Sequence, residues 1–143
     1  MTPLRIREEQ LARLAASRRD TLVEEMSRRL RREFPLQAGV LNETELRRRV
    51  GASLEAARRY GISTNAYLYR FVCVCACFGW DFAAKPDCQW MVEMLRDPEV
   101  TDPHSRLLRL YRECVRRLEI RLHNRELRER FAKNGVNAAG GAA

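Results

Sequence analysis

Residues Phe71 to Phe82 read FVCVCACFGWDF, and this stretch decides the fold of the chain. Three cysteines alternate with apolar residues, and no charged side chain occurs before Asp81. A half-buried strand would alternate apolar with polar residues, which this run does not do. The preceding residues, Tyr67 to Phe71, continue a helical spacing. We therefore predict a helix over about 64–78 that is apolar nearly all round and forms the centre of a bundle.

The cysteines of this helix are the first candidates for chemistry. Structural zinc sites use closely spaced cysteine pairs whose sulfur atoms converge on one metal ion, but on a helix Cys75 faces away from Cys73 and Cys77. A reactive thiol needs a lowered pKa, and an apolar environment raises the pKa instead. The other residues of these types, which have no partner at ligand spacing, are Cys88, Cys114, His104 and His123. We predict no metal site, no cofactor and no catalytic residue, so the cysteines serve as small apolar side chains.

The size and composition of the chain suit a small folded domain. Its 143 residues are enough for one hydrophobic core. Apolar residues make up 45% and charged residues 32%, a composition that favours a folded protein over a disordered one. Gly and Pro number only 7 and 5, and most stand at predicted helix ends. We therefore predict an all-α fold, a single-domain bundle of about five helices.

The charge is strongly basic and unevenly distributed. The net charge is +8, and arginine supplies 25 of the 27 basic residues. Residues 1–60 carry +5, residues 61–103 carry −3, and residues 104–143 carry +6. Two interpretations fit this distribution. The charges form Arg–Glu pairs on solvated helix surfaces, or the two basic regions attract an acidic partner or a polyanion.

The sequence also bears on location. The first ten residues, MTPLRIREEQ, have no apolar core of signal-peptide length. The longest apolar run, Phe71 to Trp80, is about half of what a membrane-spanning helix needs. Five cysteines are an odd number, which fits reduced thiols better than a disulfide framework. We expect a cytoplasmic protein without a membrane span, and the sequence does not indicate its oligomeric state.

Signals at helix ends divide the chain. Pro35 ends a first helix, Asn42 to Glu45 has the pattern of a capping box, and Gly61 suits the left-handed residue that follows a second helix. Asp102 is a predicted N-cap, with Pro103 at the first helical position. The predicted helices cover residues 8–34, 43–60, 64–78, 86–96 and 103–133, with loops at 36–41 and 80–86.

The first and last helices each carry an apolar stripe, which we expect to face the bundle. On the first helix the stripe contains Leu11, Leu14, Ala15, Leu22, Met26, Leu30 and Phe34. On the last helix it contains Leu107, Leu108, Tyr111, Cys114, Val115, Leu118 and Leu122, and it extends toward Leu127 and Phe131. Residues 1–133 then form a helical domain, and residues 134–143, beginning at Asn134-Gly135, form a disordered tail.

The end of the apolar helix carries the candidate binding residues. Gly79 is followed by Trp80, Asp81 and Phe82, and Trp90 comes shortly after. These rings either cap the end of the bundle or form an edge that contacts a partner, since aromatic residues are common anchors of protein interfaces. We take Trp80, Asp81 and Trp90 as candidate partner-binding residues, and we expect Phe82 to belong to the core.

Several short motifs, taken in order, resemble a known family. They are Ile6-Arg-x-Glu-x-x-x-x-Leu14, Phe34-Pro35, Arg59-Tyr60-Gly61-Ile62 with Ser63 and Thr64, Phe78-Gly79-x-Asp81-Phe82, Trp90, Leu95-x-Asp97-Pro98 and Leu110-Tyr111. Over about residues 4–120 the chain resembles small all-helical accessory proteins found beside the spike, PAAR-type and effector genes of bacterial type VI secretion clusters. The resemblance implies a helical fold and a chaperone, adaptor or immunity protein for a secreted effector or spike component.

Two functions from different classes follow. The first is a non-enzymatic protein-binding accessory factor of this kind, with Trp80, Asp81 and Trp90 at its partner surface. The alternative is a basic helical regulator that binds nucleic acid, in which Arg47 to Arg49 and Arg58-Arg59 contact phosphates. We expect a protein partner before a nucleic acid, because aromatic residues do not interleave with these arginines.

Overall fold

The computed structural model describes the backbone of residues 2–141 and the side chains of residues 7–134. This part of the chain contains six α-helices, two short 3-10 helices and no strand, so the predicted all-α fold is confirmed. The elements are α1 (Thr2–Glu33), α2 (Pro35–Ala38), α3 (Glu43–Arg59), α4 (Asn65–Phe78), η1 (Phe82–Ala84), η2 (Pro86–Cys88), α5 (Gln89–Leu95) and α6 (Pro103–Gly141).

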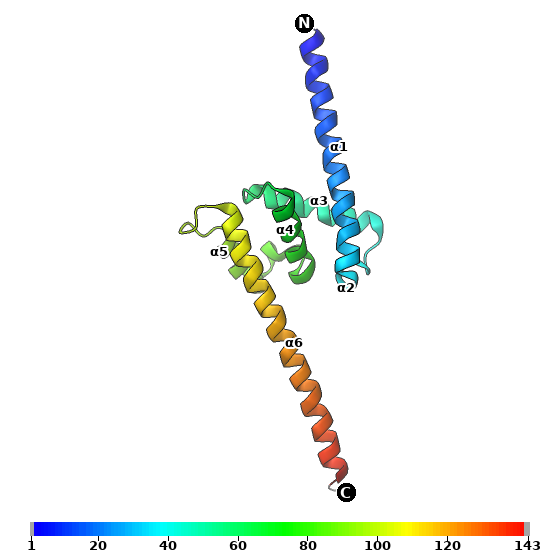
Figure 1. Ribbon diagram of the computed structural model, residues 1–143, viewed down its shortest axis with the longest axis vertical. Helices are drawn as coiled ribbons and strands as arrows, with labels where there is room; N and C mark the ends of the chain where they lie inside the picture. The colour runs from blue at the N-terminus through cyan, green and yellow to red at the C-terminus, as the bar shows by residue number, and fades with distance from the viewer. Residues whose placement is uncertain (1, 142–143) are drawn as a thin grey trace.

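The apolar helix predicted from the sequence is α4, and it lies at the centre of the molecule (Figure 1). It packs against α2, α3 and α6. Its buried residues are Leu68, Tyr69, Phe71, Val72, Cys73, Val74 and Cys75. Because consecutive residues point to different sides of a helix, a run of five buried residues requires neighbours on several sides. The prediction of a central helix is confirmed.

The turn between α3 and α4 follows the prediction in detail. Gly61 has a φ of 86°, the left-handed conformation that glycine adopts without a steric penalty. The Ile62 N–H donates to the Ala57 carbonyl at 3.1 Å, and the Gly61 N–H donates to the Arg58 carbonyl at 2.9 Å. This pair of hydrogen bonds defines a Schellman motif. Ile62 is 1% exposed and anchors the turn in the core.

Both predicted N-caps, Asp102 and Asn42, are confirmed, but only one of the two hydrogen bonds of the capping box at Asn42 forms. Asp102 Oδ2 accepts a hydrogen bond from the Ser105 N–H at 3.1 Å, as expected of an N-cap. Asn42 Oδ1 accepts one from the Glu45 N–H at 2.8 Å. The return bond of the capping box is not recorded among the described residues, because the Glu45 carboxylate bonds to Arg48 and Arg49 instead.

Four boundaries differ from the predictions. Pro35 ends α1 but also occupies the first position of α2, where its missing N–H costs nothing, so 35–38 is helical rather than a loop. The predicted loop 80–86 contains the turn η1, and the predicted fourth helix begins as the turn η2. Helix α6 continues past Asn134-Gly135 to Gly141, because no proline stops it. Residues 142–143 of the predicted tail lie outside the described residues.

The two long helices project from the central body, α1 at one end and α6 at the other (Figure 1). We call residues 7–21 the N-terminal arm and residues 119–134 the C-terminal arm. Every side chain of the arms is exposed except Leu127, which is half-buried. The expected packing of the full stripes is therefore wrong. Its exposed members are Leu11, Leu14, Ala15, Val115, Leu122 and Phe131.

The physical reason is that the arms extend beyond the body: among the described residues, Arg58 and Asn65 lie beside the inner part of the N-terminal arm but leave its side chains exposed. Leu14 is 51% exposed and Phe131 is 72% exposed, although each lies on the apolar stripe. Helical periodicity shows which side of a helix is apolar, but it does not show whether another element packs against that side.

A membrane-spanning helix must be both long and apolar. No helix among the described residues combines the necessary length and apolar character.

Candidate functional site

The segment after α4 places Trp80 and Asp81 at the mouth of a pocket. Gly79 has a φ of 137° and turns the chain sharply out of the helix. The cavity that follows has a volume of about 430 Å³, which lies in the range of small ligand sites. We call it the Trp80 pocket. It is lined, among others, by Arg59, Tyr60, Phe71, Trp80, Asp81 and Arg96.

The floor of the Trp80 pocket is aromatic. The centroid of the Phe71 ring lies 6.0 Å from that of Tyr60 and 5.9 Å from that of Phe82. Phe71 is 0% exposed and Phe82 is 3% exposed, so the expectation that Phe82 belongs to the core is confirmed. Trp80 is half-buried and packs against the core. The pocket therefore offers an apolar wall whose shape is fixed by the core beneath it.

The rim of the pocket is basic. Arg59 stands at the end of α3, Arg96 follows α5, and Arg106 comes from the first turn of α6. The Arg96 guanidinium carbon lies 5.8 Å from the centroid of the Tyr60 ring, and Arg106 Nε donates to the Val100 carbonyl. Asp81 is the one acidic residue in the lining, and its carboxylate lies 3.6 Å from Lys85 Nζ. Three guanidinium groups thus surround a pocket with a single carboxylate.

These arginines carry no recorded ion pair with any described side chain, and Asp97, next to Arg96, pairs with Arg109 at 3.3 Å. The sequence did not single out Arg59, Arg96 or Arg106 as a group. They come from three elements separated in the chain, and each resembles the other arginines in its local sequence.

Trp90 does not join Trp80 and Asp81. Its ring packs edge-on against Phe78, with centroids 6.2 Å apart. The Arg117 guanidinium carbon lies 3.6 Å from the centroid of the Trp90 ring, on the side of α6. Trp90 lines a separate shallow groove. The structure therefore brings two of the three candidate residues together and gives the third its own surroundings.

The thiols lie in surroundings that disfavour the thiolate. Burial raises the pKa of Cys73, of Cys75 and of Cys114 to about 12 in each case. Burial also raises the pKa of Cys77. Because the thiolate is the nucleophile and the metal ligand, burial disfavours the reactive form of these groups at neutral pH.

The residues that could hold a metal ion are dispersed. Within the part of the chain that the structure describes, no three His, Cys, Asp or Glu side chains come together. His104 has a structural environment: its ring stacks on Tyr67 with centroids 4.5 Å apart, and its Nε2 accepts a hydrogen bond from the Ser63 N–H at 3.2 Å. These contacts hold the start of α6 beside the start of α4.

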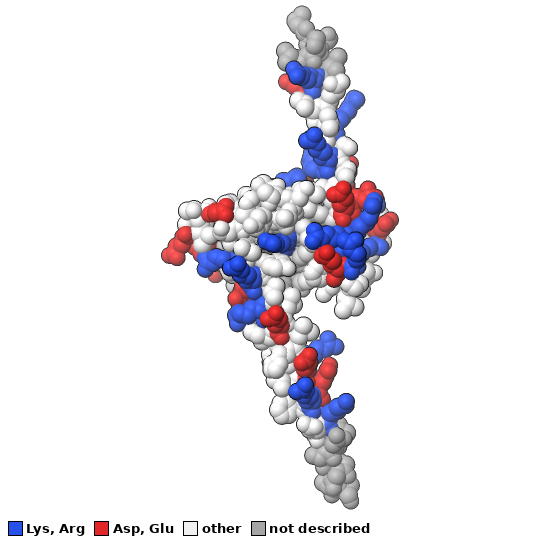
Figure 2. Space-filling view, viewed as in Figure 1, with Lys and Arg blue, Asp and Glu red and all other residues white. Residues whose placement is uncertain are grey.

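Much of the basic charge is paired within the chain. Figure 2 shows basic and acidic side chains beside one another on the body and along α6. The Arg48 and Arg49 side chains hydrogen-bond Glu45 and hold the pKa of its carboxyl at about 2. Arg116 and Arg117 do the same for Glu113, also at about 2. These contacts favour the first interpretation of the charge pattern, a solvated surface of Arg–Glu pairs.

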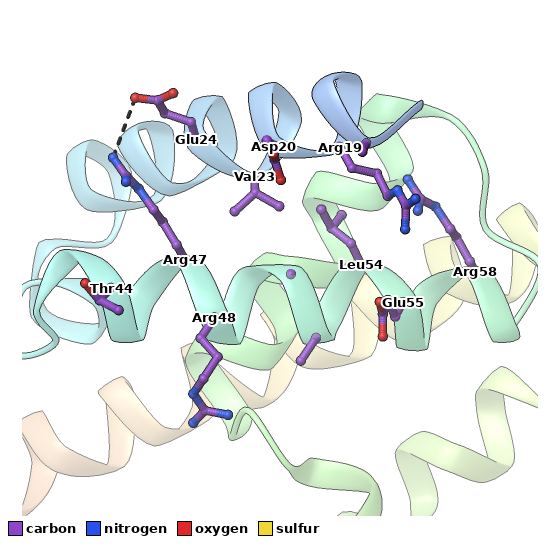
Figure 3. A pocket seen from close by; sticks show the side chains of 13 residues that line it. Arg19, Asp20, Val23, Glu24, Thr44, Arg47, Arg48, Leu54, Glu55 and Arg58 are labelled. Atoms are coloured by element: carbon purple, nitrogen blue, oxygen red, sulfur yellow. Dashed lines mark ion pairs between the residues drawn. The ribbon is translucent and has the colours of Figure 1, made fainter. Parts of the chain in front are cut away.

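A second hollow lies between α1 and α3 and has a volume of about 890 Å³ (Figure 3). Arg47 reaches across it to Glu24 at 3.6 Å. Farther along the same groove, the side chains of Arg19 and Arg58 point toward one another (Figure 3). This groove is lined by charged, small and aliphatic residues and has no aromatic side chain, so it differs in character from the Trp80 pocket.

Comparisons of the chain with protein-family models, with curated proteins and with solved structures give no match. The resemblance to accessory proteins of type VI secretion therefore stays a prediction. The fold and the Trp80 pocket are the observations from which a function can be argued.

Proposed function

We propose that this chain is a non-enzymatic protein-binding accessory factor and that the Trp80 pocket is part of its partner surface. The observation that carries the proposal is the pocket itself, in which Trp80 and Tyr60 stand beside Arg59 and Arg96. Trp, Tyr and Arg are the residues that most often dominate the energy of protein interfaces. Their combination in a solvent-open pocket beside a rigid core suits the capture of a partner side chain.

The exposed arms give further support. Leu11 is 62% exposed and Phe131 is 72% exposed, and both lie in the arms, where α1 and α6 extend beyond the body. Isolated helical segments of this length are marginal in water, and packing of an apolar face is the usual source of their stability. A protein partner is the natural supplier of such packing.

The finer proposal is that the partner is a type VI secretion effector or spike component, for which the chain acts as chaperone, adaptor or immunity protein in the cytoplasm. It rests on the resemblance of the helix-boundary motifs, among them Arg59-Tyr60-Gly61-Ile62 and Phe78-Gly79-x-Asp81-Phe82. Both motifs contribute residues to the Trp80 pocket.

An affinity capture tests this proposal. The full chain, tagged and expressed in its native host, is compared with Trp80→Ala and with Trp90→Ala, and captured proteins are identified by mass spectrometry. We expect the wild type and Trp90→Ala to retain a secretion effector or spike component, and Trp80→Ala to lose it by at least about tenfold. Equal capture of that protein by all three chains would remove the pocket from the partner surface.

The alternative function, binding of nucleic acid, has one observation in its favour. Arg112, Arg128 and Arg130 on α6 are exposed and form no recorded ion pair with another described side chain. A titration with random duplex DNA at several salt concentrations tests it. A tight complex whose affinity falls steeply with salt, as counterion release requires, would put this function first. Negligible binding at physiological salt is the result that the protein-binding proposal predicts.

A further inference from the structure

The Trp80 pocket combines an apolar floor with a basic rim, and the two surfaces fit different chemical groups of a ligand. Its floor is apolar and is formed by Tyr60 and Trp80, which are half-buried, and the buried ring of Phe71 supports Tyr60 from the core. Its rim carries the three guanidinium groups of Arg59, Arg96 and Arg106 against the single carboxylate of Asp81. A ligand that fills the floor must be apolar, and a ligand that meets the rim must be negatively charged.

The positions of the rim arginines suit an anionic group, and on a peptide side chain that group is a carboxylate. Arg106 Nε is already engaged by the Val100 carbonyl, so its remaining N–H groups are held in place. Arg96 lies near the face of Tyr60, at 5.8 Å from the ring centroid, so its guanidinium stands directly beside the apolar floor. A planar guanidinium recognises a planar carboxylate through two parallel hydrogen bonds.

The volume and the aromatic floor define the other half of the ligand. A cavity of about 430 Å³ accepts a single large side chain with part of its backbone. A free inorganic anion would meet the rim but leave the aromatic floor uncovered. A basic or uncharged peptide would meet three guanidinium groups without a counter-charge.

We propose that the Trp80 pocket binds an acidic peptide segment of the partner protein. An aromatic or large aliphatic side chain of that segment enters against Trp80 and Tyr60. A neighbouring Asp or Glu carboxylate accepts hydrogen bonds from Arg96 and Arg59. This inference rests on the proposed function and names the chemistry of the segment that the pocket recognises.

Tryptophan fluorescence gives a direct measurement. The chain has two tryptophans, so Trp90→Phe leaves Trp80, in the pocket wall, as the only one. Three blocked peptides of equal length serve as probes, with the central sequences Glu-Phe-Glu, Gln-Phe-Gln and Glu-Ala-Glu. We expect the first to shift the Trp80 emission and to bind at least about tenfold more tightly than the other two, since it alone satisfies both surfaces. Calorimetry with the wild-type chain gives the same comparison without the Trp90→Phe change.

A matched pair of arginine variants identifies the rim. Arg96→Gln removes a pocket guanidinium, and Arg112→Gln removes the same charge from an exposed part of α6 outside this pocket. We expect Arg96→Gln to weaken the Glu-Phe-Glu peptide about tenfold and Arg112→Gln to change its affinity by less than about twofold. Equal effects of the two variants would reduce the interaction to general charge attraction and overturn the proposal.

The outcomes separate this inference from the function on which it rests. Equal affinity for the three peptides, or no binding of any, overturns the inference. If Trp80→Ala nevertheless loses the partner in the affinity capture, the protein-binding function stands, and the pocket recognises a segment other than an acidic peptide. If the Glu-Phe-Glu peptide binds as expected but no secretion protein is captured, the pocket chemistry stands and the proposed partner class is wrong.

Discussion

Helix α1 is one continuous helix whose two halves have similar apolar stripes and opposite surroundings. Leu30 and Met26 lie in the body and are 0% and 5% exposed. Leu14 and Leu11 lie in the N-terminal arm and are 51% and 62% exposed. The same contrast divides α6, where Leu110 is fully buried and the distal leucines are not. An apolar stripe therefore shows which side of a helix can be buried. The tertiary fold determines how much of that side is buried within the chain.

Two phenylalanines give the strongest test of the difference between the body and the arms. Phe82 is 3% exposed in the body and Phe131 is 72% exposed in the C-terminal arm. We expect Phe82→Ala to lower the free energy of unfolding by about 3–5 kcal/mol, because it leaves a cavity in the core. Phe131→Ala should change it by less than about 0.5 kcal/mol. Urea denaturation of the two variants gives both values, and a comparable loss at Phe131 would mean that the arm is packed in solution.

A second pair makes the same test within one helix. Leu30→Ala should cost about 2–5 kcal/mol, since Leu30 is completely buried between α1 and the rest of the body. Leu14→Ala should leave the free energy of unfolding within about 0.5 kcal/mol of the wild type. The measurement is again chemical denaturation, repeated at several protein concentrations. If the Leu14 variant loses stability only at high concentration, the N-terminal arm contacts a second copy of the chain.

Two glycines, Gly61 in a turn and Gly51 inside a helix, should respond to alanine with effects of opposite sign on stability. Gly61→Ala places a Cβ at a φ of 86° and 2.9 Å from Pro103, and should destabilise the protein by about 1–3 kcal/mol. Gly51 lies inside α3, where an added Cβ meets only Val23 at 3.9 Å. Gly51→Ala should therefore stabilise the protein by about 0.5–1 kcal/mol through helix propensity. Thermal melts of the two variants should shift in opposite directions.

The smallest expected effect concerns acid. Arg48 and Arg49 hold the pKa of the Glu45 carboxyl at about 2, below its ordinary value of 4.5. A carboxyl whose pKa is lower in the folded state stabilises the fold above the unfolded pKa, and this contribution is lost as the pH falls from about 4.5 toward 2. Glu45→Gln should flatten the loss of stability in that window. Glu129→Gln, which alters a more exposed pair on the C-terminal arm, is the control for removing one carboxylate.

The parts of the fold that the sequence predicted are those with local causes. The left-handed Gly61, the N-cap Asp102 and the uninterrupted apolar run of α4 each act within a few residues, so their signals are complete in the sequence. The helical turn at Pro35 was missed because proline both ends one helix and starts the next. The exposure of the arms was missed because it depends on which described residues pack against the two helices, and helical periodicity does not contain that information.

The candidate site shows the same division. Trp80 and Asp81 were identified because aromatic and acidic residues stand out directly after a helix-ending glycine. The basic rim was not identified, because Arg59, Arg96 and Arg106 are three arginines among 25, and only tertiary contact makes them a group. The sequence grouped Trp90 with Trp80 because both are tryptophans and lie close together in the chain. In the structure, Arg117 of α6 packs on the Trp90 ring, away from the Trp80 pocket.

The length of α6 separates the two ends of this helix by a fixed distance. Its 39 residues, at about 1.5 Å of rise each, make a rod on the order of 60 Å long. Because α1 leaves the body at the opposite end, groups attached to the start of α1 and to the end of α6 are held far apart (Figure 1). A small target cannot engage both at once, whereas an extended one can, with the gain in avidity that two linked contacts bring. For a partner that contacts both ends, the central body therefore sets the distance between the two contacts.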